Sequence, residues 1–313
     1  MQLSRFAKFA WVLLAWNIIV VLWGAFVRAT GSGAGCGNHW PLCNGEVVPR
    51  APQVETLIEL SHRLTSGVAL IGVLILLIWA FRGFPKGHPV RWGAVASAFF
   101  IITESLVGAA LVIFGWVADD TSAERALVVS IHLFNTFLLL ASLAVTAWWA
   151  SGQRPITLKS SGWIVWGLRA GLLGMLVIGI TGAITALGDT LFPVASTGGG
   201  LRQSVEPGQH FLVQLRVWHP LLSILVSVYL LVLTRVLSNQ ETNATVNRLS
   251  RTLAILLVVQ LAAGFLNILL SVPVWMQIVH LLLADLVWIS LVLLSASVAA
   301  VPVPKFEPAP QAA

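Results

Sequence analysis

The sequence predicts an all-α integral membrane protein with eight transmembrane helices, arranged as two tandem, pseudo-symmetric four-helix bundles. Composition is the first observation: 58% of the 313 residues are hydrophobic and 10% are charged, whereas soluble domains carry about 25% charged residues. The second is a series of eight apolar stretches, each long enough to supply the roughly 20 residues that cross a bilayer. The third is that the second half of the chain repeats the first.

Each apolar stretch is expected to form one membrane-spanning helix. The first, at 8–28, follows Arg5 and Lys8 and is too long for the apolar core of a typical signal peptide, so it counts as a true span. The others lie at 62–81, 93–116, 126–149, 162–187, 211–234, 250–271 and 275–299. The proline-rich tail 301–313 is expected to be disordered.

Basic residues predict the orientation, because Lys and Arg favour cytoplasmic loops near helix ends. With eight spans, the basic segments before the first helix, after the eighth and in alternate loops all fall on one side. Both termini are therefore expected in the cytoplasm of a multi-pass plasma-membrane protein. The net charge of +6 then sets topology in the lipid bilayer, and no nucleic acid is expected as a partner.

Both cysteines lie in one glycine-rich stretch, GSGAGCGNHWPLCNG at 31–45. It belongs to the loop 29–61, which this topology places on the extracytoplasmic side, where disulfides persist. A disulfide between Cys36 and Cys43 is therefore expected. A metal pair is the weaker alternative, because two thiols alone do not complete a tetrahedral site.

The repeat consists of four matched segments in the same order, at offsets between 148 and 158 residues. They are WGAFVRATG with TGAITALG (Gly24 and Gly182), ELSHR with RVWHP (His62 and His219), ESLVGAALV with QLAAGFLNI (Glu104 and Gln260), and IHLFNTFLLLASL with VHLLLADLVWISL (His132 and His280). Parallel repeats are a known membrane architecture. The matches predict an N-terminal bundle at 1–150 and a C-terminal bundle at 151–300.

Each half contributes two histidines inside predicted spans, His62 and His132 in the first and His219 and His280 in the second. An ionisable side chain within a span usually faces the bundle interior and marks function, although a lone histidine can simply bond a neighbouring helix. Imidazole binds zinc, copper and iron. Zinc normally needs four ligands, whereas haem needs only two axial ones. We therefore expect one haem iron per bundle, with room left by Gly24, Gly108, Gly182 and Gly264.

Several arginines near the outer ends of the predicted spans could bind haem propionates, because a guanidinium matches a carboxylate. Each could equally extend its charge to the membrane interface. They are Arg28, Arg63, Arg125, Arg202 and Arg216.

The repeat breaks at Glu59, whose counterpart is Arg216. Glu59 precedes His62 by three residues and so shares a helix face with it. This difference predicts different roles for the two bundles. The carboxylate could stabilise positive charge on a reacting group or act as a base, or it could be a helix-start residue favoured by the dipole. Glu104 and Asp285 could relay protons or pair with neighbours.

The segments VRATGSGAGCGNHWPLCNGEVVP and ELSHRLTSG, with the four spaced histidines, resemble the haem A synthase family in its bacterial two-cysteine branch, over about residues 8–299. The resemblance implies oxidation of the C8 methyl group of haem O to a formyl group by successive hydroxylations, supplying haem A to cytochrome oxidase. It implies haem O as substrate between His62 and His132, and a haem b cofactor between His219 and His280. Glu59 matches the catalytic carboxylate.

The same resemblance implies haem O synthase as a partner and a role for the two cysteines in haem handling. His39 stands where the family usually has an acidic residue before the Trp-Pro pair. The electron acceptor is unidentified, and a homo-oligomer is compatible with the sequence. The rival functions are a bis-histidine dihaem membrane cytochrome b linked to quinol, a haem carrier, and a membrane thiol oxidoreductase.

Overall fold

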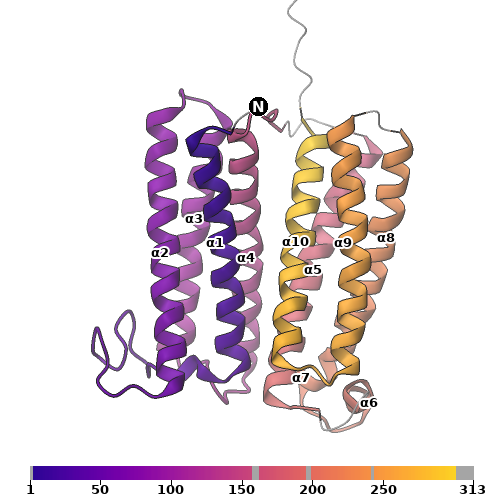
Figure 1. Cartoon of the computed structure of the whole chain (residues 1–313). Coiled ribbons are helices and arrows are strands. Elements are labelled where there is room, and N and C mark those ends of the chain that lie inside the picture. Colours follow the sequence, from indigo (N-terminus) through magenta and orange to yellow (C-terminus); the bar gives the residue numbers. More distant parts are fainter. Residues whose placement is uncertain (1–2, 157–161, 195–198, 241–242, 301–313) are drawn as a thin grey trace, which may run out of the picture.

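The computed structural model describes residues 3–156, 162–194, 199–240 and 243–300 (Figure 1). The predicted fold class is confirmed, because these ranges contain eight helices long and apolar enough to span a membrane and no β-strand. The long helices are α1 (Arg5–Ala29), α2 (Val54–Gly83), α3 (Pro89–Ile113), α4 (Ala123–Ala150), α5 (Trp163–Leu191), α8 (Trp218–Gln240), α9 (Ala244–Leu269) and α10 (Val274–Val298). The short ones are η1 (Ser32–Ala34), α6 (Gly199–Val205), α7 (Phe211–Gln214) and η2 (Leu215–Val217).

The long helices form two four-helix bundles that stand side by side (Figure 1). In the first, α1 packs against α2 and α4, and α3 packs against the same two helices. In the second, α5 and α9 each pack against α8 and α10. The bundles meet through α1 and α4 on one side and α5 and α10 on the other. At this interface Phe137 of α4 and Trp288 of α10 stack with ring centroids 5.2 Å apart.

Polar residues at the helix starts define where several helices begin. Ser4 accepts a hydrogen bond from the backbone N–H of Ala7 at the start of α1, and Ser122 accepts one from Arg125 at the start of α4. Such side-chain caps satisfy N–H groups that have no partner inside the helix. In α3, Pro89 occupies the first turn, where its missing N–H costs nothing.

Helix α2 begins at Val54, eight residues before the predicted apolar span at 62–81. The difference arises because hydropathy marks the part of a helix that contacts lipid, whereas hydrogen bonding continues into the polar interface. Glu59 therefore lies inside α2, one turn before Arg63. The matching part of the second bundle is divided into α7 and η2, and η2 carries Arg216.

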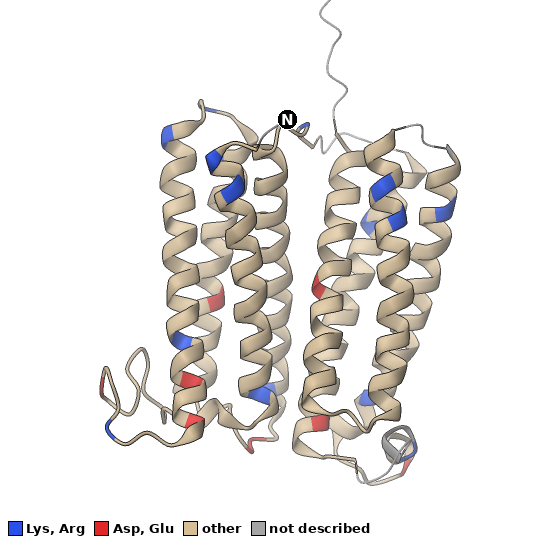
Figure 2. Ribbon diagram, in the orientation of Figure 1, with Lys and Arg blue, Asp and Glu red and all other residues tan. Residues whose placement is uncertain are grey.

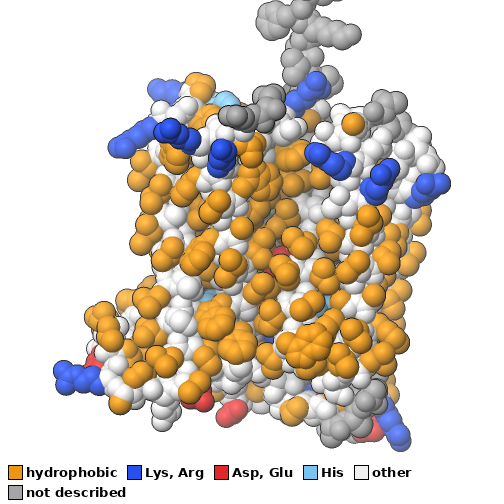
Figure 3. All heavy atoms as spheres, in the orientation of Figure 1, with side chains coloured by type: hydrophobic (Ala, Val, Ile, Leu, Met, Phe, Trp, Pro, Cys, Tyr) orange, Lys and Arg blue, Asp and Glu red, His pale blue; other side chains and the backbone are white. Residues whose placement is uncertain are grey.

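Charge and apolar surface are separated along the bundle axis. Apolar side chains cover the middle of the molecule, and Lys and Arg gather at the end where α1 begins and α10 ends (Figures 2 and 3). The chain thus starts and ends its membrane-spanning part on the same side, as an even number of spans requires. The tail 301–313, expected to be disordered, lies outside the described residues.

Candidate functional site

Each of the four predicted histidines lies against a glycine of a neighbouring helix. The pairs are Gly24 with His62, Gly108 with His132, Gly182 with His219, and Gly264 with His280. A Cβ atom added at Gly24 would lie 2.9 Å from the His62 ring, and one at Gly182 or Gly264 would lie 3.0 Å from the facing ring. At Gly108 the nearest ring atom would be 3.7 Å away, an ordinary contact. Glycine thus leaves space for the imidazole in both bundles.

The two histidines of the second bundle have a spacing that suits one iron atom. The ring centroids of His219 and His280 are 6.3 Å apart, and the ring planes are nearly perpendicular, at 87°. Two imidazoles on opposite sides of one metal would have centroids about 6 Å apart, given metal–nitrogen bonds of about 2 Å. The donor set and spacing therefore fit the bis-histidine ligation of a haem.

One cavity connects the histidine sites of both bundles. Its volume is about 1140 Å³, and it is lined by all four histidines and their four glycines, with Glu59 and Glu104. Pockets for single small molecules have volumes of about 300–1,000 Å³, so this cavity is larger than one such ligand requires. In addition, Nδ1 of His62, His132 and His280 is buried without a hydrogen bond in the described part of the chain, although Nδ1 of His132 lies 3.2 Å from Oε1 of Glu104. Buried imidazoles that are not used by the protein are available for a ligand.

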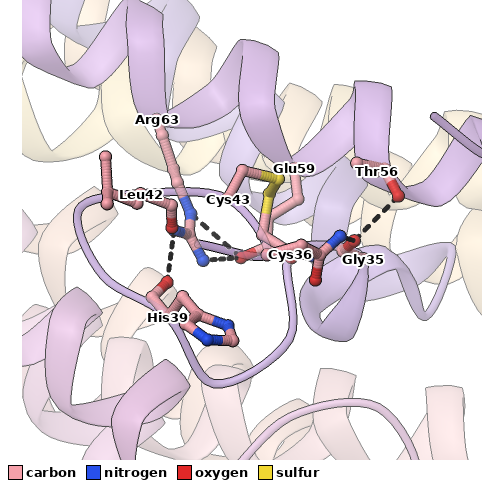
Figure 4. Close-up of polar contacts among 9 residues, drawn as sticks. Gly35, Cys36, His39, Leu42, Cys43, Thr56, Glu59 and Arg63 are labelled. Carbon is pink, nitrogen blue, oxygen red and sulfur yellow. Dashed lines mark hydrogen bonds and ion pairs between the residues drawn. A yellow bond between two sulfur atoms is a disulfide. The ribbon is translucent and has the colours of Figure 1, made fainter. Parts of the chain in front are cut away.

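The Cys36–Cys43 disulfide is present, as the sequence predicted, and its loop lies on the first turns of α2 (Figure 4). The backbone N–H of Cys36 donates to Oε2 of Glu59 at 2.8 Å. Arg63 forms an ion pair with Oε1 of Glu59 and donates through Nη1 to the carbonyl oxygens of His39 and Leu42, each at 2.7 Å. Glu59 is only 3% exposed. Its carboxylate is therefore enclosed between α2 and the loop.

A close backbone approach completes this attachment. The hydroxyl of Thr56 donates to the carbonyl oxygen of Gly35 at 2.7 Å. A Cβ atom at Gly35 would collide with the backbone of Glu55 and Thr56. Further along the loop, Trp40 and Pro41 line the cavity beside Glu59. The disulfide loop thus covers the part of the cavity that contains Glu59 and His62.

Arg28 connects the two bundles. Although it belongs to α1, its guanidinium donates to the carbonyl oxygen of Ala186 at 2.6 Å and to the hydroxyl of Thr190 at 2.5 Å, both on α5. It also donates to Oε1 of Gln277 on α10 at 2.9 Å. Arg28 lines the cavity as well. Its bonds join separate halves of the chain, a role that its position in the sequence did not indicate.

The other predicted arginines divide into two groups. Arg125 lines the cavity and donates to two carbonyl oxygens of the α3–α4 loop, at 2.6 and 2.7 Å. Arg216 also lines it and forms an ion pair with Asp189 at 3.0 Å. Arg202 instead is exposed and lies 3.9 Å from Glu206. It is not among the cavity-lining residues described here, so the structure does not bring it to the predicted site.

Glu104 occupies a position that the sequence left unassigned. Its Oε1 atom lies 3.2 Å from Nδ1 of His132, and its other contacts are with Asn135 and Thr136. The sequence contained a signal for a polar cluster around His132. Asn135 and Thr136 follow His132 by three and four residues and so face the same side of α4. Asp285 is fully buried, and neither carboxylate oxygen has a hydrogen-bond partner within the described ranges.

Comparison with known proteins covers nearly the whole chain. Residues 7–292 match the family COX15-CtaA, described as "Cytochrome oxidase assembly protein". The chain is similar to a protein of Thermus thermophilus named "Protoheme IX farnesyltransferase". The two are 56% identical over 275 residues, and this aligned region covers 88% of this chain and 45% of that protein.

Two further relatives are named "Heme A synthase". They come from Bacillus mycoides, 40% identical, and Bacillus cereus, 39% identical, over 142 residues that cover 45% of this chain and 43% of each relative. The chain spans less than half the length of these curated relatives. The family resemblance predicted from the sequence is confirmed, and the match over residues 7–292 shows that the chain belongs to the COX15-CtaA cytochrome oxidase assembly family, the heme A synthase family.

Proposed function

We propose that this protein is a haem A synthase that oxidises the C8 methyl group of haem O to a formyl group by successive hydroxylations. The observation that carries the proposal is a pair of similar histidine–glycine sites with unequal surroundings. In the first bundle Glu104 lies against His132, and Glu59 precedes His62 by three residues on α2. The described side-chain contacts of His219 and His280 are instead with a threonine hydroxyl and an amide. Membership of the heme A synthase family supports the same conclusion.

The two bundles have different roles in this proposal. His62 and His132 hold the substrate haem O. His219 and His280 hold haem b, which supplies one-electron transfer when it is bound. The 6.3 Å separation of the latter two rings supports this assignment, because both imidazoles would be able to hold a single iron atom.

Glu59 is the proposed catalytic carboxylate. The N–H of Cys36 and the guanidinium of Arg63 hold its two oxygen atoms in place. A preorganised charge stabilises an opposite charge that develops on the substrate during reaction. The disulfide loop above it excludes water from this part of the cavity, which strengthens such an interaction.

Arg28, Arg125 and Arg216 are proposed to bind the haem propionates. All three line the cavity, and each is held by protein oxygen atoms that fix the direction of its guanidinium. An oriented guanidinium can bind a carboxylate through two parallel hydrogen bonds. The ion pair between Arg216 and Asp189 partly neutralises this group.

We further propose the surroundings of the protein. The basic end of the bundles faces the cytoplasm of the plasma membrane, by the preference of Lys and Arg for that side, and the disulfide loop faces outward. Haem O synthase is the proposed partner. The Thermus relative supports it, because a protein named protoheme IX farnesyltransferase contains a segment 56% identical to this chain within a much longer sequence.

Replacing Glu59 with Gln tests the proposed reaction. The chain is expressed together with haem O synthase, and the extracted haems are separated by chromatography. Glu59→Gln is expected to retain bound haem and to lower haem A formation by about 10²–10³-fold, the loss typical of removing one preorganised electrostatic group. The matched control is Glu55→Gln, an exposed carboxylate on the same helix, which is expected to form haem A normally.

Other outcomes would decide against the proposal. A normal haem A yield from Glu59→Gln would remove Glu59 from the mechanism. Two permanently bound b haems in the unaltered protein, with no haem A in any extract, would instead identify a dihaem cytochrome. A single haem that exchanges freely and is chemically unchanged would identify a carrier.

A further inference from the structure

A network of polar side chains surrounds His132 in the first bundle. Oε1 of Glu104 lies 3.2 Å from Nδ1 of His132 and also accepts a hydrogen bond from Thr136. Its other oxygen accepts from Nδ2 of Asn135 at 2.6 Å. Asn135 in turn accepts from the hydroxyl of Thr103 at 2.7 Å. The carboxylate of α3 is therefore held in place by two side chains of α4, at ion-pair distance from one particular nitrogen of the imidazole.

The internal repeat shows what the second bundle has in the same places. At the offset of Glu104 and Gln260, Thr103 corresponds to Val259. At the offset of His132 and His280, the residues matching Asn135 and Thr136 are Leu283 and Ala284. At the position of Glu104, Gln260 contacts its histidine through a neutral amide and on the other ring nitrogen, with Nε2 of Gln260 3.3 Å from Nε2 of His280. The polar network thus belongs to the first bundle, and one amide replaces it in the second.

The other two histidines also lack an acidic neighbour. His219 has the hydroxyl of Thr181 at 3.4 Å, and among the described residues no carboxylate lies at ion-pair distance from His62. Across those residues, His132 is the one intramembrane histidine at ion-pair distance from a carboxylate. The asymmetry is therefore specific to His132.

A carboxylate beside the second nitrogen of an iron-bound imidazole has a known physical effect. It accepts the N–H, increases the electron donation of the ligand and stabilises the more highly charged metal. The negative charge of the carboxylate also stabilises the oxidised iron. This attraction is larger in a membrane interior than in water, because the dielectric constant is lower there. A hydrogen bond to the outer nitrogen of an iron-bound imidazole is one of the means by which a protein sets a haem potential.

We propose that Glu104 is a positioning residue that lowers the midpoint potential of the haem bound by His132 relative to that of the haem bound by His280. The inference rests on the proposed function in one respect, that each bundle binds a haem. It gives Glu104 a role separate from that of Glu59, which lies on α2 beneath the loop. The oxidised iron is then favoured in the first bundle, and the reduced iron in the second.

A redox titration of the full-length protein tests this inference. The chain in detergent is loaded with haem b in both bundles, so that the two sites differ only in their protein surroundings, and haem absorbance is followed against potential. Glu104→Gln is expected to shift one haem to a higher potential. At a fixed potential its ratio of reduced to oxidised iron should rise about tenfold, which corresponds to about 59 mV for a one-electron couple.

Two further variants separate charge from structure. Glu104→Asp keeps the carboxylate and is expected to stay near the wild-type potential. Gln260→Glu adds a carboxylate at the matching position and is expected to lower the potential of the other haem, by a similar amount. Electron paramagnetic resonance of the oxidised protein should show altered g-values for one haem in Glu104→Gln and for the other haem in Gln260→Glu.

The outcomes are distinct. Unchanged potentials in Glu104→Gln with haem retained, or an equal shift of both haems, would overturn the inference. If Glu104→Gln loses its haem, the test depends on Gln260→Glu. An unchanged haem potential in Gln260→Glu would then overturn the inference. Haem A formation by the unaltered chain is measured separately. Shifted potentials without any haem A would leave this inference standing and refute the proposed function. Haem A formation with unchanged potentials would support the proposed function and overturn this inference.

Discussion

At Gly24 the backbone of α1 comes so close to α2 that a single added methyl group would meet the ring of His62. Small residues at such positions allow helices to approach closely within a membrane. Here the space gained on one helix is occupied by the imidazole of the next. Because the second bundle repeats this arrangement at Gly182 and Gly264, glycine and histidine form one structural unit. The glycine sets the position of the ring, and therefore the direction of its nitrogen atoms.

Gly24→Ala is expected to reduce haem binding in the first bundle. The new Cβ atom would lie 2.9 Å from the His62 ring, so the ring must move. Disturbing the support of a metal-binding residue costs about 10- to 100-fold in affinity. Loss of helix stability cannot explain such a result, because alanine favours a helix over glycine by about 1 kcal/mol. The measurement is the haem absorbance per protein after titration with haem.

The comparison variant for that prediction is Gly108→Ala. Its Cβ atom would lie 3.7 Å from the His132 ring, which requires no movement, so a smaller loss of affinity is expected. Equal losses in both variants would show that ring displacement is not the cause.

The elements themselves were largely predictable, and their contacts were not. All eight spans follow from apolar length, and the disulfide follows from the side of the membrane assigned to the loop. The start of α2 was placed eight residues late, because residues 54–61 are helical without being apolar. The partners of Glu59 were also unpredictable. They depend on the loop folding back onto α2, which a hydropathy pattern does not describe.

Gly35→Ala is expected to release the disulfide loop from α2. Its φ angle of −63° suits alanine, so the effect comes from collision with the backbone of Glu55 and Thr56. The chain around Arg50 is already exposed, so its cleavage by trypsin depends on how often the loop opens. Cleavage after Arg50 should become about tenfold faster if the substitution makes opening more favourable by about 1.4 kcal/mol. Mass spectrometry of the fragments in detergent measures the rate.

Gly33→Ala is the control within the same loop. A Cβ atom there would lie 3.4 Å from the side chain of Val117, close to an ordinary contact, so cleavage near the wild-type rate is expected. Faster cleavage in Gly33→Ala alone would mean that the loop is held by η1 rather than by its contact with α2.

At the scale of the whole molecule, the internal repeat predicts two bundles but not how they face each other. Repetition describes each half, whereas the interface is formed by residues that differ between the halves. Arg28 is an example, since it crosses from α1 to α5 and α10. Trp288 is another, because its Nε1 donates to the backbone carbonyl of Phe137 at 2.6 Å. Such contacts join residues more than 150 positions apart, and only the folded chain shows them.

A double-mutant cycle measures what the Arg28 contact contributes to holding the bundles together. Arg28→Met and Gln277→Leu are made singly and together, and the free energy of unfolding is measured by far-ultraviolet circular dichroism in detergent and denaturant. Groups in contact typically show coupling energies of about 0.5–3 kcal/mol. A coupling in the upper half of that range is expected, because the guanidinium is charged and hydrogen bonds to charged groups contribute about 1.5–3 kcal/mol.

The control cycle pairs Arg28→Met with Trp288→Leu. Trp288 lies eleven residues beyond Gln277 on α10, about 16 Å along the helix at about 1.5 Å per residue, and shares no hydrogen-bond partner with Arg28 in the described structure. The two changes should therefore add. Additivity in the first cycle would show that the contact between Arg28 and Gln277 does not help to join the bundles. Equal coupling in both cycles would mean that either substitution loosens the whole interface, in which case the orientation of the bundles depends on apolar packing rather than on this charged contact.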